Sequence, residues 1–284
     1  MQQPVNSNPE SSALATLGAL LLDNALPRLE ASLLLAHVLG CERVSVLAHP
    51  ERELTAAEAL RFAELRCRRL EGEPIAYLTG WREFYGLRLM VTSAVLIPRP
   101  ETEGLVAAAL ERMPLHGACR VLDLGTGSGA AAIAIAKERP CARVHAIDVS
   151  EAAVALAHRN ARAHGATNMT CQVSDWYSAC AGIYDVIVSN PPYIDEGDSH
   201  LDLGDLRFEP GLALISGSDG LEAIRKIVAQ SRAHLAPGGW LMLEHGFNQG
   251  AQCRQLMLAS GLVTITTRPD MAGIERISCG RAPP

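Results

Sequence analysis

Residues 121–129 read VLDLGTGSG, an apolar segment that runs directly into a glycine-rich turn. A run of small and apolar residues follows at 130–137, so the expected order is strand, turn and helix. Glycines permit positive φ and let the backbone approach a ligand without an intervening Cβ. The pattern therefore predicts a βα unit of a parallel α/β sheet whose turn can bind a ligand.

The spacing of the glycines narrows the kind of ligand. The pattern is G-x-G-x-G, one residue short of the dinucleotide fingerprint G-x-G-x-x-G. The turn contains no basic residue that could meet a pyrophosphate, which favours a nucleoside cofactor without phosphates. The alternative is an ordinary tight βα connection. The candidate cofactor-binding residues of this turn are Gly125, Thr126, Gly127, Ser128 and Gly129.

Polar and aromatic residues follow the next two apolar segments. Asp148 ends the expected strand at 143–147, where a carboxylate can accept both hydrogens of a ribose diol. Asp175 and Trp176 follow the expected strand at 169–173, and could accept from the amino group of an adenine and cover its ring. The alternative for Trp176 is a half-buried packing role.

A second turn, Asn190, Pro191, Pro192 and Tyr193, closes the apolar strand Tyr184–Ser189. Ligands of a parallel sheet bind outside the carboxyl ends of its strands, so both turns should open onto one crevice. The side-chain oxygen of Asn190 and the carbonyl of Pro191 can accept the two hydrogens of an NH2 group. The prolines restrict the backbone, and Tyr193 offers a flat face for stacking. This favours methyl transfer to a planar nitrogen, rather than a strand merely stopped by two prolines.

These motifs resemble the class I S-adenosylmethionine-dependent methyltransferases of the Asn/Asp-Pro-Pro-Tyr type. Further stretches are similar to the release factor glutamine methyltransferases, the protein-(glutamine-N5) methyltransferase family. They are PIAYLTG at 74–80, REFYG at 82–86, LIPRPETE at 96–103, FEP at 208–210, DGL at 219–221 and EHG at 244–246.

The resemblance implies an α/β fold, a Rossmann-like methyltransferase domain with a mostly parallel seven-stranded sheet, preceded by a small helical bundle. We expect an N-terminal helical substrate-recognition domain at 1–82, a β-hairpin or extended linker at 83–98 and the S-adenosylmethionine-dependent methyltransferase domain at 99–284. The alternation of expected strands and helices after residue 98 agrees with this division. Segments 262–267 and 275–279 are expected to form an antiparallel edge.

The resemblance also implies roles. The cofactor would be S-adenosyl-L-methionine, with its methionine portion on Gly125 to Gly129, its ribose at Asp148 and its adenine at Trp176. Asn190 to Tyr193 would hold the glutamine of the Gly-Gly-Gln motif of peptide chain release factors. The loop at 99–103 would border the cofactor pocket. The alternative is that its acidic residues only stabilise the first turn of the following helix through the helix dipole. His245 is expected to be structural rather than a general base.

Composition limits the partners. The chain has 284 residues, 48% of them hydrophobic, and a net charge of −6, so no autonomous nucleic-acid binding is expected. No segment is apolar enough to span a membrane, and no secretory signal is recognisable. The eight cysteines form no C-x-x-C pair, so we expect free thiols, no metal site and a cytoplasmic location. The first ten residues are polar and expected to be frayed.

Other functions stay open at this point. A ribosomal-protein glutamine could replace the release factor as substrate. The Asn-Pro-Pro-Tyr turn could instead serve amino methylation of a nucleic-acid base, which the acidic balance disfavours. A non-catalytic scaffold is disfavoured by the intact glycine turn, Asp148 and Asn190.

Overall fold

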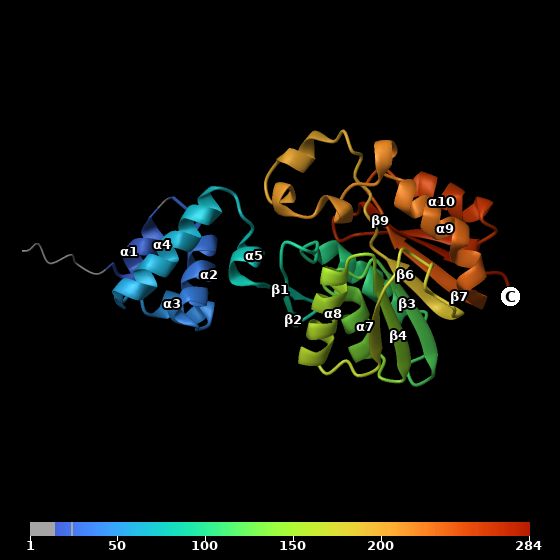
Figure 1. Ribbon diagram of the computed structural model, residues 1–284, viewed down its shortest axis with the longest axis horizontal. Coiled ribbons are helices and arrows are strands. Elements are labelled where there is room, and N and C mark those ends of the chain that lie inside the picture. The colour runs from blue at the N-terminus through green and yellow to red at the C-terminus, as the bar shows by residue number, and fades with distance from the viewer. Residues whose placement is uncertain (1–14, 24) are drawn as a thin grey trace, which may run out of the picture. The chain divides into compact units, whose positions relative to one another are not determined.

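The structure is a computed structural model that describes residues 15–23 and 25–284. The ten polar residues expected to be frayed lie outside this range. The chain divides into two compact units, Met1–Thr79 and Gly80–Pro284. Figure 1 traces both units along the chain.

The first unit is helical. Its described helices are α1 (Leu17–Leu22), α2 (Arg28–Leu39), α3 (Arg43–Ala48), α4 (Ala56–Leu70) and α5 (Ile75–Thr79). Leucines of α1 and α2 pack with Phe62 of α4 in a core of its own. Helix α4 begins with a capping box in which Thr55 and Glu58 satisfy each other's backbone N–H groups. The expected N-terminal helical bundle is confirmed within the described residues.

The second unit is built on a seven-stranded sheet. The strands are β3 (Cys119–Leu124), β4 (Ala142–Asp148), β5 (Met169–Val173), β6 (Tyr184–Ser189), β7 (Leu235–Glu244), β8 (Val263–Pro269) and β9 (Glu275–Arg281). Their order is β5-β4-β3-β6-β7-β9-β8. Strands β3 to β7 are parallel, whereas β9 pairs antiparallel with both β7 and β8. The Rossmann-like fold and its antiparallel edge are confirmed.

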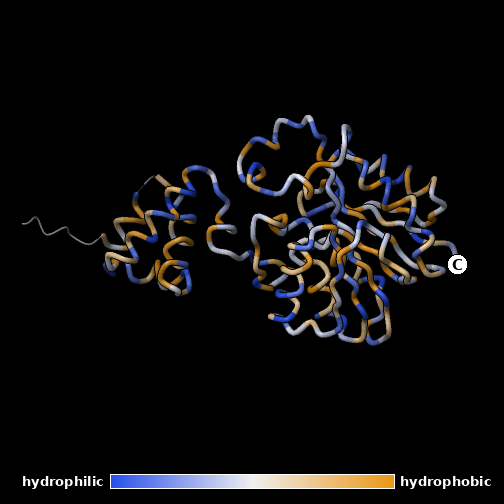
Figure 2. The backbone as a smooth tube through the Cα atoms, in the orientation of Figure 1, coloured by the Kyte–Doolittle hydropathy of each residue, from blue (hydrophilic) through white to orange (hydrophobic). Residues whose placement is uncertain are grey.

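Two apolar layers cover the two faces of this sheet. One layer contains residues of α6 (Glu103–Leu110), α7 (Ala130–Glu138) and α8 (Glu151–Ala163). The other contains residues of α9 (Glu222–His234) and α10 (Gly250–Ala259). Strand β3 serves both layers, since Val121 faces the first and Leu122 the second. Figure 2 shows hydrophobic residues concentrated along the central strands. No helix in the described ranges is long and apolar enough to cross a membrane.

A short hairpin opens the second unit. Strand β1 (Trp81–Phe84) pairs antiparallel with β2 (Leu87–Met90) across Tyr85 and Gly86, which both have positive φ. The strands end at Met90, so the rest of the segment expected at 83–98 continues without strand. Residue 90 pairs with Trp81, and the chain before Trp81 turns into α5, so no partner strand remains for the residues after 90.

A buried side chain ties the hairpin to the glycine turn. Asn160 of α8 is 0% exposed. Its Oδ1 accepts from the backbone N–H of Met90 at 2.8 Å, and its Nδ2 donates to the carbonyls of Met90 at 3.0 Å and Ser128 at 2.8 Å. One amide therefore holds two segments that are far apart in the chain.

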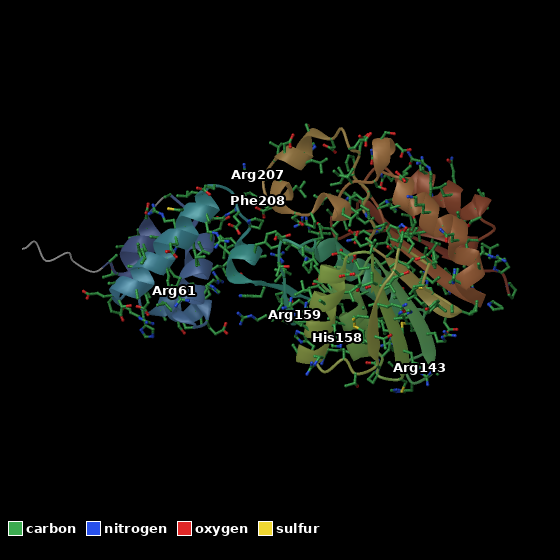
Figure 3. The ribbon with its side chains drawn as sticks, viewed as in Figure 1. Arg61, Arg143, His158, Arg159, Arg207 and Phe208 are labelled. Carbon is green, nitrogen blue, oxygen red and sulfur yellow. The ribbon has the colours of Figure 1, made fainter. Side chains whose placement is uncertain are left out.

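Replacement of Asn160 by Ala leaves these three backbone groups unpaired. We expect the free energy of unfolding to fall by about 2 to 4 kcal/mol. Urea unfolding followed by tryptophan fluorescence measures this unit alone, because all three tryptophans lie in it, at 81, 176 and 240. His158→Ala is the control, since His158 is exposed on the same helix (Figure 3) and should change stability by less than about 0.5 kcal/mol. Equal effects of the two variants would contradict the role given to Asn160.

Candidate functional site

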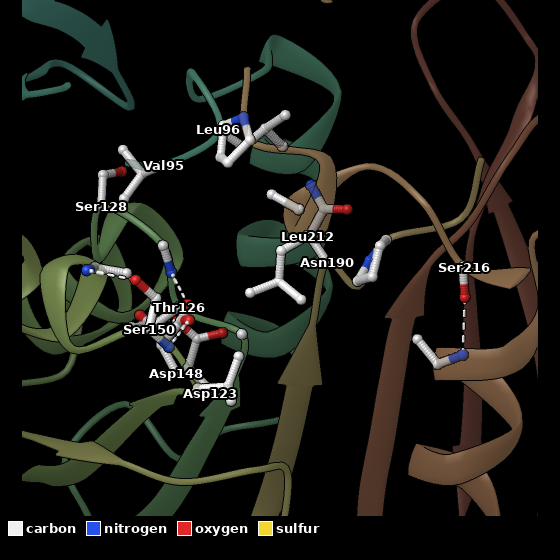
Figure 4. Close-up of a pocket in the computed structure, with 18 of the residues that line it drawn as sticks. Val95, Leu96, Asp123, Thr126, Ser128, Asp148, Ser150, Asn190, Leu212 and Ser216 are labelled. Atoms are coloured by element: carbon white, nitrogen blue, oxygen red, sulfur yellow. Dashed lines mark hydrogen bonds between the residues drawn. The ribbon is translucent and has the colours of Figure 1, made fainter. Parts of the chain in front are cut away.

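A cavity of about 620 Å³ lies at the carboxyl ends of the parallel strands. This volume falls within the ~300 to 1,000 Å³ typical of small-molecule sites. The chain after β3 and the chain after β6 contribute opposite walls, and Leu124 pairs with Ser189 where the two strands end. In Figure 4, Asn190 and Leu212 lie across the cavity from Asp148 and Thr126.

The glycine turn forms one wall. Gly125 has φ of 71° and Gly127 has φ of 56°, a region that favours glycine over residues with a Cβ. The Thr126 hydroxyl donates to Oδ2 of Asp123 at 2.6 Å, and the Thr126 N–H donates to the carbonyl of Ile147 at 2.8 Å. Burial raises the pKa of Asp123 to about 6. The backbone of this turn is therefore fixed from both sides before any ligand binds.

Asp148 closes β4 at the rim of the same wall. Its Oδ2 accepts from the N–H of Gly127 at 2.9 Å, and its Oδ1 accepts from the N–H of Ser150 at 3.0 Å. Burial raises the pKa of Asp148, although these backbone hydrogen bonds oppose the shift. Each carboxylate oxygen retains further lone pairs, so the group can still accept from a diol in the cavity.

Trp176 forms part of the lining with Asp175. Its backbone has φ of 46°, unusual for a bulky residue, and its carbonyl accepts from the Ser174 hydroxyl at 2.8 Å. A Cβ placed on Gly125 would lie 3.7 Å from Cζ3 of Trp176, so the indole ring lies close to the glycine turn. The strained backbone aims a flat aromatic side chain at the cavity.

Asn190 lines the opposite wall. Its Nδ2 donates to Oγ1 of Thr102 at 3.0 Å, whereas its Oδ1 is buried and has no hydrogen-bond partner in the part of the chain described. Buried polar atoms are nearly always paired, so a bare acceptor beside a cavity indicates a ligand that donates there. The preceding Ser189 holds this wall in place, because its hydroxyl donates to the carbonyl of Leu124 at 2.7 Å.

The cavity brings together most of the predicted site residues. They are Gly125, Thr126, Gly127, Ser128, Asp148, Asp175, Trp176, Asn190 and Pro192. Three others lie outside the lining. Gly129 immediately precedes α7, and a Cβ at this position would press against Ile133 and Ala157. Pro191 is buried, and Tyr193 packs partly buried against the second apolar layer.

The structure adds residues that the sequence patterns did not single out. Thr102 and Arg99 line the cavity from the 99–103 loop. Leu212 lines it from the 3-10 helix η4 (Gly211–Ala213), and Ile215 lines it from the chain just after η4. Buried Glu209 joins these two segments, since it accepts from the N–H of Ile97 at 3.1 Å and from Arg99 at 2.5 Å. The stretches LIPRPETE at 96–103 and FEP at 208–210 pointed to this region through their family resemblance, but no chemical pattern in them identified the individual residues.

His245 is buried and uses both ring nitrogens within the protein. Its Nδ1 lies 2.9 Å from the carbonyl of Gly246, and its Nε2 lies 3.0 Å from Oγ of Ser278. Burial lowers the pKa of His245, which favours the neutral ring. These contacts support a structural role.

Comparisons with known proteins find one family model in each of the two units. A model of the PrmC N-terminal domain matches residues 12–80, and a model of the methyltransferase small domain matches residues 105–209. A crystal structure of a methyltransferase from Pyrococcus furiosus aligns with a TM-score of 0.54 at 21% identity, over 78% of this chain and 100% of that one. Fold and site thus define a class I methyltransferase that uses S-adenosyl-L-methionine.

Curated relatives narrow the class. A release factor glutamine methyltransferase of Xylella fastidiosa (strain Temecula1) is 51% identical over 90% of this chain and 94% of its own length. One from Escherichia coli (strain K12) is 48% identical over 90% of this chain and 92% of its own. The chain belongs to the release factor glutamine methyltransferase family.

The cavity fits this cofactor. A glycine wall without basic residues suits a ligand without phosphates, and the Asp148 carboxylate and the Trp176 ring suit a ribose and an adenine. We expect Asp148→Ala to weaken binding of S-adenosyl-L-methionine by roughly ten- to a hundredfold, because two hydrogen bonds to a charged acceptor are lost. Isothermal titration calorimetry measures this affinity. Glu151→Gln, an exposed carboxylate that begins α8 outside the cavity, is the control and should bind normally. Normal binding by Asp148→Ala would contradict the assignment.

Proposed function

We propose that this protein transfers a methyl group from S-adenosyl-L-methionine to the side-chain amide nitrogen (N5) of the glutamine in the Gly-Gly-Gln motif of peptide chain release factors. Family membership supports the substrate class. The observation that carries the chemistry is the buried, unpaired Oδ1 of Asn190 at the wall facing the glycine turn. A carboxamide NH2 is the donor that such an acceptor matches.

Backbone and side-chain groups at the cavity divide the work. Gly125 to Ser128, Asp148, Asp175 and Trp176 would bind and orient the cofactor, which supplies an electrophilic methyl group. Asn190 Oδ1 and the Pro191 carbonyl each accept one hydrogen of the substrate amide. This orientation turns the face of the nitrogen toward the methyl carbon. Pro192 stiffens the turn, and Tyr193 supports it from the apolar layer.

An amide nitrogen is a weak nucleophile because its lone pair is delocalised into the carbonyl. The two acceptors offset this weakness, since they position the nitrogen and stabilise the positive charge that develops on it. The nitrogen forms a bond to the methyl carbon as the sulfur–carbon bond breaks, and one amide proton then leaves to water. No side chain has to remove a proton before the transfer.

The direct test is incubation of the purified protein with labelled S-adenosyl-L-methionine and a purified release factor. Mass spectrometry of the glutamine-bearing peptide should show one added methyl group on that glutamine. A release factor with Gln replaced by Asn in the motif is the matched control and should stay unmodified. Methylation of RNA or DNA in place of the protein would contradict the proposal.

Asn190→Ala removes one of the two acceptors. We expect turnover to fall by about 100-fold or more, since a transition-state hydrogen bond to a fixed acceptor is lost. Cofactor affinity measured by calorimetry should change little. Asn190→Asp, which keeps an acceptor but can no longer donate to Thr102, should retain more turnover than Ala. Unchanged turnover of the Ala variant would refute the role of Asn190.

We further propose that the helical unit, which ends at Thr79, recognises the release factor, and that the protein acts in the cytoplasm. The helical unit has its own apolar core, and the described cavity draws all its residues from the other unit. All eight cysteines are free thiols, as expected in a reducing compartment. The net charge of −6 supports a protein substrate rather than a nucleic acid.

Deletion of residues 1–80 tests the recognition role. We expect the KM for an intact release factor to rise by tenfold or more, because the enzyme loses a docking surface, while cofactor affinity stays within about twofold. A short peptide that contains Gly-Gly-Gln is the control substrate and should be methylated at a similar rate by both forms. A parallel fall in cofactor binding would show that the bundle only supports the fold.

A further inference from the structure

Gln249 carries a buried amide that joins three stretches of the chain next to the substrate wall. It is 6% exposed, immediately precedes α10 and does not line the cavity. Its Nε2 donates to the carbonyls of Tyr193 at 3.0 Å and Gly220 at 3.3 Å, and its Oε1 accepts from the N–H of Gly246 at 2.8 Å. Both hydrogens of this amide are therefore used within the protein.

The carbonyl of Tyr193 lies at the end of the turn that presents the proposed amide acceptors. The two prolines before it have no N–H, so neither can fix the turn by donating a backbone hydrogen bond. Backbone pairing resumes at Ile194, whose N–H donates to the carbonyl of Leu214 at 2.9 Å. The hydrogen bond from Gln249 thus holds the chain directly after the prolines, two positions beyond the Pro191 carbonyl.

The same hydrogen bond restricts which residue can stand at position 220. Gly220 is buried and has φ of 70°, a conformation that favours glycine. A Cβ there would overlap the carbonyl oxygen of Tyr193 and approach Nε2 of Gln249 to 2.8 Å. Any larger residue at 220 would therefore push this donor and this acceptor apart. Two positions distant in the sequence, 220 and 249, control one contact of the turn.

We propose that Gln249 is a positioning residue for methyl transfer, which acts through the Tyr193 carbonyl to fix the turn that carries the Pro191 acceptor. This inference rests on the proposed amide methylation. With the turn held, the Pro191 carbonyl keeps its direction while positive charge develops on the substrate nitrogen, so the acceptor does not have to reorganise. The contact also gives a role to DGL at 219–221 and EHG at 244–246, two family-like stretches outside the cavity lining.

Gln249→Met replaces the amide by a side chain of similar length that cannot donate to the Tyr193 carbonyl. We expect kcat to fall by roughly ten- to a hundredfold, because a small displacement of a positioning group is enough to misalign the reacting atoms. Cofactor affinity measured by calorimetry should stay within about twofold, since Gln249 does not line the cavity. A normal kcat in a folded Gln249→Met protein would overturn the proposal.

Asn168→Leu is the matched control for a loss of stability alone. Nδ2 of Asn168 donates to three backbone carbonyls, those of Ala136 at 3.1 Å, Arg139 at 3.2 Å and Ala142 at 3.0 Å, and Asn168 does not line the cavity. Its loss should lower the midpoint of urea unfolding about as much as Gln249→Met does, while kcat stays within about twofold. Equal losses of kcat in the two variants would show that Gln249 only supports the fold.

Two glycine variants separate the contact at Tyr193 from backbone strain. Gly220 and Gly165 have φ of 70° and 66°, so an alanine is strained at both positions. A Cβ on Gly165 meets nothing within 4 Å, whereas one on Gly220 meets the Tyr193 carbonyl. We expect kcat to fall by about tenfold or more in Gly220→Ala and by less than about twofold in Gly165→Ala. If Gln249→Met does not fold, this comparison decides the proposal by itself.

The double variant Gly220→Ala/Gln249→Met gives the sharpest kinetic result. Both changes break the same hydrogen bond, so the double variant should be little slower than the slower of the two single variants. Losses of kcat that multiply would mean that the two positions act independently, and would overturn the proposal.

Selective isotope labelling provides a readout that does not depend on turnover. The pair Tyr-Ile occurs once in the chain, at 193–194, so a carbonyl label in tyrosine and a nitrogen label in isoleucine isolate this peptide group. Its NMR signal should shift in Gln249→Met and Gly220→Ala, and stay in place in Asn168→Leu and Gly165→Ala. A signal that ignores the first two changes would contradict the proposal. If the wild type methylates no glutamine at all, the proposed function fails, while the NMR signal still decides whether Gln249 holds the turn.

Discussion

The site depends on the parallel pairing of β3 with β6. The register places Leu124 opposite Ser189, the last residues of the two strands, and the Ser189 hydroxyl locks that end to the Leu124 carbonyl at 2.7 Å. The glycine turn and the Asn-Pro-Pro-Tyr turn must therefore leave the sheet side by side. This junction is the point where the strand order reverses, which is where open α/β sheets bind their ligands. The proposed cofactor and substrate sites adjoin because the two strands end at the same level.

Both walls of the cavity are rigid before a ligand arrives. On the cofactor side, Asp123, Asp148 and Asn160 each hold backbone or hydroxyl groups of the glycine turn. On the substrate side, Thr102 holds the nitrogen end of the Asn190 amide. Such fixed groups do not have to reorganise as charge develops, which is the main way in which a site without a general base can lower a barrier.

The carboxyl group of Glu209 is buried beside the substrate wall. Glu209 links the 97–99 segment to the 3-10 segments, and burial raises its pKa even though Arg99 opposes the shift. A buried carboxyl group is costly unless it is paired and hydrogen-bonded, and for Glu209 the Ile97 N–H and the Arg99 guanidinium provide those partners.

The order of the elements, the two turns and the family could be predicted from the residues alone, because glycine spacing, strand-length apolar runs and paired prolines are local properties of the chain. The sequence placed β4, β5, β6 and the antiparallel edge within a few residues of their limits. It did not give the length of the hairpin within the segment 83–98, because that length depends on where the opposite strand finds a partner. The contacts of Thr102 with Asn190, 88 positions away, and of Asn160 with Met90, 70 positions away, could not be predicted in this way. Contacts of this kind are set by how the strands and helices pack in space, and no local pattern of residues encodes them.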